Sequence, residues 1–323
     1  MPPSHASVPK AEPEIIRDVL GGDFRAVARL ISLVENDLLM AVPYLRELFP
    51  HTGRCFSVGV TGAPGSGKST LVDCLAERFG SDSRKVGIIA VDPTSPFSGG
   101  AILGDRIRMQ SRSLDPGTFI RSMATRGHLG GLSRATNDVL MIMDAAGFDT
   151  VLIETVGVGQ DEVEIARTAD ATLVLLVPGM GDDIQAMKAG IMEIGDIFVI
   201  NKADHAGVGR VEIELNALLA ISTRPDGWKP AVVRTVASKG QGIDACIEEI
   251  TKYRTFLQAS PYQRKRSIQI QKDRLLEVIQ ARILESLLRQ SDKKERLEDL
   301  ARAVAERRID PFTAADKLLE IKD

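Results

Sequence analysis

The nonapeptide GAPGSGKST at residues 62–70 constrains the fold of this 323-residue chain more than any other stretch. It fits the pattern G-x-x-x-x-G-K-S, follows the apolar run FSVGVT and precedes the helical pattern TLVDCLAERF. A glycine-rich loop between a strand and a helix curls its backbone N–H groups around phosphate oxygens, and the helix dipole favours the anion. The sequence therefore predicts an α/β domain with a phosphate-binding loop formed by Gly62, Ala63, Pro64, Gly65, Ser66, Gly67, Lys68, Ser69 and Thr70.

Two residues of this loop have predicted chemical roles. Lys68 is expected to neutralise the β and γ oxygens of a nucleoside triphosphate, and the Ser69 hydroxyl is expected to ligate Mg²⁺. The alternative is a glycine-rich turn without a ligand. The strand before the motif and the helix after it count against that alternative.

Short apolar segments alternate with helical patterns through the middle of the chain, which is typical of a parallel sheet covered by helices on both faces. The expected strands are FSVGVTG, KVGIIAVD, TFIRSM, DTVLIET, ATLVLLV, DIFVIN and AVVRTVA. Only helix-spaced apolar positions occur before and after them. We therefore predict an N-terminal helical extension at 1–53, a P-loop domain with a doubly wound sheet at 54–258, and a C-terminal helical extension at 259–323.

A second element on the phosphate side is predicted in DTVLIETVG, where Glu154 and Gly157 stand in the places of a D-x-x-G motif. Eighty-five residues separate Ser69 from Glu154, which leaves room for two more strand–helix units and indicates a wholly parallel sheet. The Gly157 amide is expected to sense the γ-phosphate. Position 158 is valine rather than a water-orienting glutamine, so unaided hydrolysis should be slow, with Gln160 as a candidate substitute.

The base is indicated by VINKAD, in which Asn201, Lys202 and Asp204 follow a strand and match N-K-x-D. The Asp204 carboxylate can accept both N1–H and N2–H of guanine, whereas adenine offers no donor on that edge. Lys202 is expected to lie along the base, and Asn201 to tie this segment to the phosphate loop. One strand later, VASKGQG places Ala237, Ser238 and Lys239 where a backbone N–H would meet guanine O6.

Three further segments have the composition of loops at the same edge of the sheet. In VDPTSPFSGGAILGDRIRM, Asp92 and Asp105 are the carboxylates most able to reach Mg²⁺, although Asp105 could equally cap a helix. The segment RSMATRGHLGG carries Arg121, Arg126 and His128, which could face nucleotide or a partner. A third segment, PGMGDDIQAMKAG, contains Lys188. Lys68, Glu154, Gly157 and Lys188 are the candidate catalytic residues, and Ser69, Asp92, Asp105 and Glu154 the candidate metal ligands.

Composition excludes several classes of function. A formal net charge of −3 gives no overall attraction to nucleic acid. Three widely spaced cysteines argue against a disulfide framework or a zinc site and favour a reducing compartment. The longest apolar runs are too short to span a bilayer. We expect a soluble cytoplasmic chain that binds neither nucleic acid nor membrane.

Together, GAPGSGKST, VDPTSPFSGGAILGDRIRM, RSMATRGHLGG, ETVGVGQDE and INKAD resemble the MeaB/ArgK/MMAA family of G proteins over nearly the whole chain. The resemblance implies a SIMIBI-like GTPase that binds GTP, GDP and Mg²⁺. It also implies a homodimeric chaperone that associates with adenosylcobalamin-dependent methylmalonyl-CoA mutase, gates cofactor loading and protects the mutase from inactivation. The phosphate and metal positions of the family fall on Lys68, Ser69, Asp92, Asp105 and Glu154, and its partner-sensing switch on residues 179–188.

Alternative functions stay open at this point. An ATP-dependent kinase of the amino-acid transport type would not need Asp204, and a nickel-delivering GTPase usually carries a His-rich tract, whereas this chain has four histidines. Cobalamin is expected on the partner, because the motif D-x-H-x-x-G is absent. The stripe Leu276, Ile279, Ile283 and Leu287 could pack on the chain's own P-loop domain or form a dimer.

Overall fold

The computed structural model describes residues 11–81, 84–92, 117–124, 131–155, 160–179, 192–222, 224–289 and 291–319. The chain divides into two compact units, residues 1–266 and 267–323.

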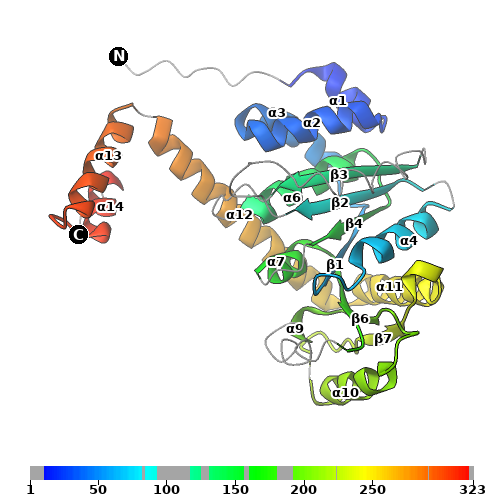
Figure 1. Cartoon of the computed structure of the whole chain (residues 1–323). Coiled ribbons are helices and arrows are strands. Elements are labelled where there is room, and N and C mark those ends of the chain that lie inside the picture. Colours follow the sequence, from blue (N-terminus) through cyan, green and yellow to red (C-terminus); the bar gives the residue numbers. More distant parts are fainter. Residues whose placement is uncertain are drawn as a thin grey trace. The chain divides into compact units, whose positions relative to one another are not determined.

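The first unit is built on a parallel sheet of seven strands in the order β3-β2-β4-β1-β5-β6-β7 (Figure 1). Every predicted strand is confirmed, and so is the prediction of a wholly parallel sheet. The carboxyl ends of all strands therefore meet at one edge, where ligands of open α/β sheets bind. The strands are β1 Phe56–Gly62, β2 Val86–Asp92, β3 Thr118–Ala124, β4 Thr150–Glu154, β5 Ala171–Leu176, β6 Ile197–Ile200 and β7 Ala231–Arg234.

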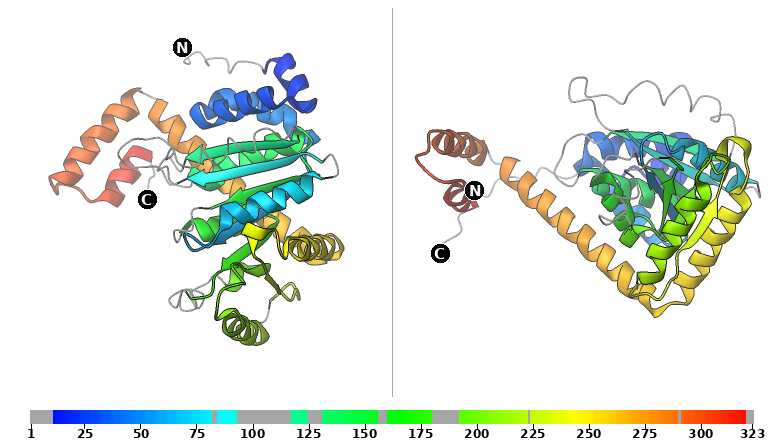
Figure 2. Two further views of the ribbon diagram at one scale, coloured as in Figure 1. Left: turned by 45° about the vertical axis from the view of Figure 1, so that its right-hand side comes forward. Right: turned by 60° about the horizontal axis from the view of Figure 1, so that its bottom comes forward.

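Helices cover both faces of this sheet, as its apolar strands require (Figure 2). One face packs Val58 and Val60 against Leu71 of α4 and Ile250 of α11. The other face packs against α6 and α7, and α10 covers the β5–β6 end of the sheet. These helices and the two short turns beside them are α4 Lys68–Gly80, α6 Gly131–Ala145, α7 Gln160–Thr168, α9 Met192–Ile194, α10 Val208–Ile221, the 3-10 turn η3 Ala237–Lys239, and α11 Ile243–Ala259.

The predicted N-terminal extension is helical and shares its core with the sheet. It forms α1 Pro13–Leu20, α2 Phe24–Asn36, α3 Leu38–Leu48 and the 3-10 turn η1 Phe49–His51. The Asp23 carboxylate caps α2 by accepting hydrogen bonds from the Arg25 and Ala26 amides, 2.9 and 2.8 Å away. The Phe24 ring contacts Phe119 of β3 and Phe148, which precedes β4. The extension therefore packs onto the β3 side of the sheet rather than standing apart.

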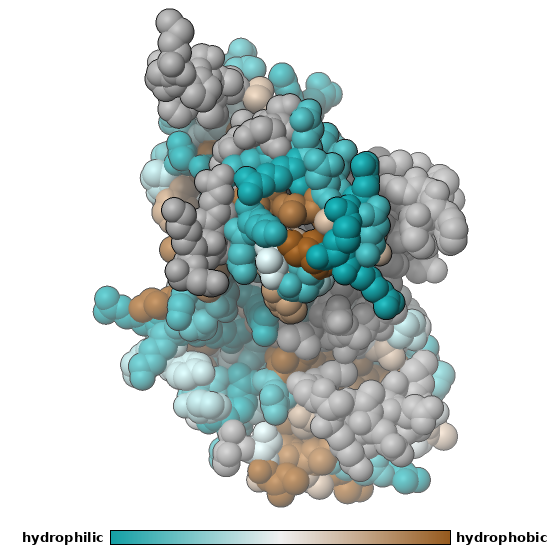
Figure 3. Space-filling model, turned by 90° about the vertical axis from the view of Figure 1, so that its left-hand side faces the viewer, coloured by the Kyte–Doolittle hydropathy of each residue, from teal (hydrophilic) through white to brown (hydrophobic). Residues whose placement is uncertain are grey.

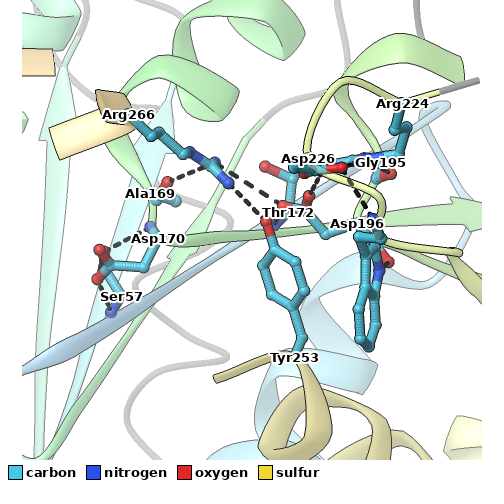
Figure 4. Close-up of polar contacts among 11 residues, drawn as sticks. Ser57, Ala169, Asp170, Thr172, Gly195, Asp196, Arg224, Asp226, Tyr253 and Arg266 are labelled. Carbon is cyan, nitrogen blue, oxygen red and sulfur yellow. Dashed lines mark hydrogen bonds and ion pairs between the residues drawn. The ribbon is translucent and has the colours of Figure 1, made fainter. Parts of the chain in front are cut away.

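The amino-terminal edge of the sheet holds a buried polar network centred on Asp196 (Figure 4). The Asp196 carboxylate accepts hydrogen bonds from the Thr172 amide at 2.9 Å and from the Arg224 guanidinium at 2.7 Å. Arg224 also donates to Asp226 at 2.8 Å and to the Gly195 carbonyl at 2.8 Å. The loop before the edge strand β7 is thereby tied to the starts of β5 and β6.

Arg266 attaches the first turns of α12, Pro261–Arg289, to the same edge. Its guanidinium donates to the Tyr253 hydroxyl at 2.6 Å and to the Ala169 carbonyl at 3.3 Å (Figure 4). A carboxylate oxygen of Asp196 lies 3.8 Å away. The first unit ends at Arg266, the residue that makes these contacts.

The second unit is helical, as predicted, and continues α12 into α13, Ser291–Ala305, and α14, Pro311–Leu319. Asp310 caps α14 by accepting from the Phe312 and Thr313 amides at 3.0 and 2.9 Å. The described residues of the predicted apolar stripe, Leu276, Ile279 and Ile283, are about half exposed. In Figure 3, apolar side chains lie between hydrophilic ones in the α13–α14 hairpin, and another apolar patch lies over α10 at the bottom of the view.

Candidate functional site

The phosphate loop has the geometry that its sequence predicts. It connects β1 to α4, and α4 begins at Lys68 directly after Gly67. Gly67 has φ +93°, and a Cβ there would lie 2.4 Å from the Asn201 side-chain nitrogen. A Cβ on Gly62 would lie 2.4 Å from the Leu175 carbonyl oxygen of β5. Only glycine fits at these two positions. Because these residues have no side chain, the loop backbone can turn closely toward the first amides of α4.

Two polar side chains of the loop are buried. The Lys68 ammonium donates to the Gly62 and Ala63 carbonyls, at 2.7 and 3.0 Å. The Ser66 hydroxyl has no hydrogen-bond partner among the described residues, although Ser66 is almost fully buried. A buried cation and an unpaired buried hydroxyl beside curled backbone amides fit a phosphate group, which supplies only acceptor oxygens at neutral pH.

Ser69 and Glu154 come together from α4 and the end of β4. The Ser69 hydroxyl donates to a Glu154 carboxylate oxygen at 2.5 Å. Hydroxyl and carboxylate oxygens suit Mg²⁺, which takes its remaining ligands from phosphate and water. No group of three or more His, Cys, Asp or Glu side chains with metal-binding geometry occurs within the described residues. Asp92 ends β2 at the same sheet edge, with its side chain outside the description, and Asp105, Gly157 and Lys188 lie outside the described residues.

Asn201 joins the phosphate loop to the predicted base-binding segments. Its side-chain nitrogen donates to the Ser66 carbonyl at 2.8 Å. Its side-chain oxygen accepts from the Ala237 amide and from the Thr235 hydroxyl, each at 3.1 Å. Asn201, Ser66, Thr235 and Ala237 are all buried. The link from Asn201 to the phosphate loop is therefore present as the sequence predicts.

The charged residues of the base-binding segments lie nearer the surface. Lys202 reaches across the phosphate loop and donates to the Gly65 carbonyl at 2.9 Å. The exposed Asp204 carboxylate accepts from the Lys239 ammonium at 2.8 Å. This hydrogen bond lowers the pKa of Asp204 below its ordinary value, so the carboxylate is ionised and ready to accept N–H donors.

The remaining predicted residues divide into those at the site and those elsewhere. Pro64, Thr70 and Ser238 are exposed at the same edge of the sheet. Arg121 does not face a nucleotide, because its guanidinium binds the Glu35 carboxylate and the Ser32 hydroxyl of α2. Arg121 therefore fastens the N-terminal helices to β3, a correction to the prediction from its loop-like neighbourhood. Arg126 and His128 lie outside the described residues.

Sequence reasoning missed three threonines at this edge. Thr235 follows β7 and binds Asn201. The Thr155 hydroxyl, directly after Glu154, donates to the Thr61 hydroxyl of β1 at 3.1 Å, and both residues are buried. Threonine after a strand is too common to stand out in a sequence, and the only available signal was the position next to a recognised motif.

Comparison with known proteins agrees with this geometry. The sequence profile of the family described as "Methylmalonyl Co-A mutase-associated GTPase MeaB" matches residues 27–292. A Pyrococcus abyssi protein is 49% identical over 311 residues, 95% of each chain. A Mus musculus protein named "Methylmalonic aciduria type A homolog, mitochondrial" is 36% identical over 270 residues, which cover 82% of this chain and 65% of the mouse protein.

A solved structure shares the fold along nearly the whole chain. The crystal structure of LAO/AO transport system kinase is 28% identical, has a TM-score of 0.69, and matches over 95% of this chain and 96% of that one. Among the described residues, none of the helices combines the length and the apolar character needed to cross a bilayer. The profile match covers most of the chain and the phosphate loop has the expected form, so this chain belongs to the MeaB family and is a P-loop GTPase.

Proposed function

We propose that this chain binds GTP with Mg²⁺ at the carboxyl edge of its sheet and hydrolyses it to control association with an adenosylcobalamin-dependent methylmalonyl-CoA mutase. The observation that carries the nucleotide part is the buried side chain of Asn201. It joins the phosphate loop at Ser66 to the base-binding turn at Ala237, so that both ends of one nucleotide would be held together.

Guanine recognition is assigned to Asp204 and the turn η3. The exposed carboxylate, which also accepts from Lys239, would accept N1–H and N2–H of guanine, whereas adenine has no N–H donor at those two positions. In the turn η3, the Ala237 amide donates to Asn201 and the Lys239 amide donates to the Val236 carbonyl. The Ser238 amide is therefore our candidate donor to guanine O6.

The phosphate side supplies the groups for hydrolysis. Lys68 would neutralise the β and γ oxygens, and Ser69 and Glu154, with Asp92 and Asp105, would hold Mg²⁺. The metal ion would screen the charge that develops on the phosphate oxygens. Gly157 would bind the γ-phosphate through its amide, and Lys188 would take part in the loop that senses the partner. Hydrolysis would then release the ordered loops.

The client is proposed from the family description and from the name of the mouse relative. The chain would act as a chaperone that gates cofactor loading and protects the mutase. Changes in the loops that contact the γ-phosphate would alter its affinity for the mutase, because a ligand shifts a conformational equilibrium only by its differential affinity for the two states.

A pull-down with purified mutase tests this proposal. We expect mutase binding to differ between GDP and a non-hydrolysable GTP analogue. Asp204→Asn supplies a matched control. Mutase binding by this variant should change with the state of a xanthine nucleotide and no longer with the state of a guanine nucleotide. Equal mutase binding in both nucleotide states would contradict the switch, and no binding in either state would contradict the client.

A second candidate is a phosphotransferase, favoured by the name of the solved relative, LAO/AO transport system kinase. A kinase would place labelled γ-phosphate on a protein acceptor, whereas the proposed GTPase releases it as free phosphate. Asp204 favours the GTPase, because adenine lacks the N1–H and N2–H donors that guanine would present to this carboxylate.

The homodimer is proposed from the exposed apolar residues of α12, of which Leu276, Ile279 and Ile283 are 49%, 43% and 52% exposed. Each large apolar side chain buried in an interface contributes about 1.5–3 kcal/mol. Leu276→Lys with Ile283→Lys should therefore shift the protein from dimer to monomer in sedimentation, while Gln280→Lys on the same helix should not. A wild-type protein that sediments only as a 35.0 kDa species would end this proposal.

A further inference from the structure

Thr235 binds the predicted guanine-reading segment through three different atoms. Its amide donates to the Ile200 carbonyl at 2.9 Å, and its carbonyl accepts from the Ala203 amide at 3.0 Å. Its hydroxyl donates to the side-chain oxygen of Asn201 at 3.1 Å. Thr235 is 1% exposed, so these contacts are made away from solvent. The end of β7 thus holds both sides of the segment that contains Lys202.

Lys202 has a backbone conformation that needs such support. Its φ is +55°, in the left-handed region that residues other than glycine adopt at an energetic cost. Such a conformation persists only where the surroundings fix it. Thr235 contacts the residues directly before and after Lys202, namely Asn201 and Ala203. With this conformation, the Lys202 ammonium reaches the Gly65 carbonyl of the phosphate loop.

The hydroxyl of Thr235 adds a hydrogen bond to the Asn201 amide, whose orientation is set by the Ala237 N–H and the Ser66 carbonyl. The amide oxygen accepts from two donors, the Thr235 hydroxyl and the Ala237 N–H. The amide nitrogen is thereby directed to the Ser66 carbonyl. A flipped amide would set its N–H₂ group against the Ala237 N–H and its oxygen against the Ser66 carbonyl, so the observed orientation is the only one that satisfies all partners.

We propose that Thr235 is a positioning residue for guanine recognition, whose hydroxyl holds the Asn201 amide so that the phosphate loop and the base-reading segment keep a fixed separation. Thr235 touches no atom of the nucleotide in this account and acts through Asn201. The proposal rests on the proposed function, because it concerns the same guanine-nucleotide site.

Thr235→Val removes the hydroxyl and keeps the shape of the side chain and all backbone contacts. We expect it to weaken GDP binding by about tenfold, the effect of losing one buried hydrogen bond and its geometry. Thr235→Ser keeps the hydroxyl and should bind GDP within about twofold of wild type. Thr172→Val is the matched control: Thr172 is buried on β5, its hydroxyl has no partner among the described residues, and it lies at the opposite edge of the sheet.

The experiment is calorimetric titration of GDP and ADP, each with Mg²⁺, into the folded full-length variants, and thermal unfolding confirms folding. Action through Asn201 is tested by a double-mutant cycle: in an Asn201→Ala background, Thr235→Val should add less than about twofold. A merely structural role would give the same loss in both backgrounds. Thr235→Ala, which places no methyl group against the amide oxygen, provides a second form of the test if the valine variant does not fold.

Unchanged GDP affinity in Thr235→Val or Thr235→Ala would overturn the inference, and so would an equal loss with and without Asn201. Loss of binding in Thr235→Ser as large as in Thr235→Val would also overturn it. A wild-type protein that binds ADP as tightly as GDP would instead refute the proposed guanine site itself, and the wild-type titration separates that outcome from the others.

Discussion

The two edges of the parallel sheet both carry charged side chains, and among the described residues the buried network of ion pairs lies at the amino edge. At the amino edge, Arg224 donates to both Asp196 and Asp226, and all three side chains are largely shielded from solvent (Figure 4). At the carboxyl edge, Asp204 is exposed and the buried Ser66 hydroxyl lacks a partner among the described residues. Polar groups that are buried and paired hold a fold together, whereas groups left accessible or unpaired are available to a ligand.

The largest expected effect is a loss of stability when a charged side chain is removed at the amino edge. Arg224→Ala should lower the free energy of unfolding by about 3–5 kcal/mol, because it removes the guanidinium that bonds both buried carboxylates and leaves Asp196 with the more distant Arg266, 3.8 Å away. Urea unfolding measures the change. Arg210→Ala, which removes an exposed ion pair with Glu214, should leave the unfolding midpoint where it is. Equal midpoints for Arg224→Ala and wild type would remove the distinction between the edges.

The second-largest expected effect is a slower GTP hydrolysis when a charged side chain is removed at the carboxyl edge. Lys68→Ala should slow GTP hydrolysis by about a hundredfold or more, because the phosphate oxygens lose their cation. Lys85→Ala is its control: the Lys85 ammonium also donates to a carbonyl, that of Ala146, but beside the opposite edge. Steady-state phosphate release measures both variants. Similar losses in the two would show that the carboxyl edge has no special role in the chemistry.

A smaller effect is expected on the choice of base. Asp204→Asn should weaken GDP binding by about tenfold and improve binding of xanthosine diphosphate, since the amide donates where the carboxylate accepted. Competition titrations with both nucleotides measure the change in selectivity. Asp244 of α11 forms an exposed ion pair with Arg78 of α4, and Asp244→Asn should leave selectivity unaltered. If selectivity for guanine survives in Asp204→Asn, Asp204 does not read the base.

The smallest effect is a dependence of stability on pH. Burial alone would raise the pKa of Asp226, but hydrogen bonds from Arg224 and from the Trp228 amide leave it below the ordinary value. A carboxyl group with a lowered folded pKa stabilises the fold above its unfolded pKa, near 4, and this contribution is lost as the pH falls through the folded value. Unfolding midpoints from pH 6 to pH 3 should therefore fall more steeply for wild type than for Asp226→Asn. Parallel curves would contradict this.

Local patterns predicted most of the fold. All seven strands were visible as apolar runs, since period and composition are set within a few residues. The pair Asp310 and Pro311 is a local pattern of the same kind, typical of a helix start, and Asp310 caps α14. The contact of Asn201 with the phosphate loop was predictable because its motif has a known geometry, although the two partners lie 135 positions apart.

Partner choice between distant residues could not be predicted in this way. The bond from Arg121 to α2 joins residues 86 positions apart, and Ser57 binds Asp170 across 113 positions. Neither pair belongs to a motif, and an arginine or aspartate has the same local pattern whether it faces a ligand or another helix. The role of Thr235 was missed for the same reason. The dimer, the metal ligands Asp92 and Asp105, and the contributions of Gly157 and Lys188 stay predictions.

The most direct test of the account is the affinity of the wild-type protein for GTP and for ATP, measured by calorimetry with Mg²⁺ under identical conditions. The pocket built by the phosphate loop, Asn201 and Asp204 predicts that GTP binds at least about a hundredfold more tightly, because adenine has no N–H donor at the positions where guanine presents N1–H and N2–H to the carboxylate. Equal affinities for the two nucleotides would contradict the central claim that this edge of the sheet selects guanine.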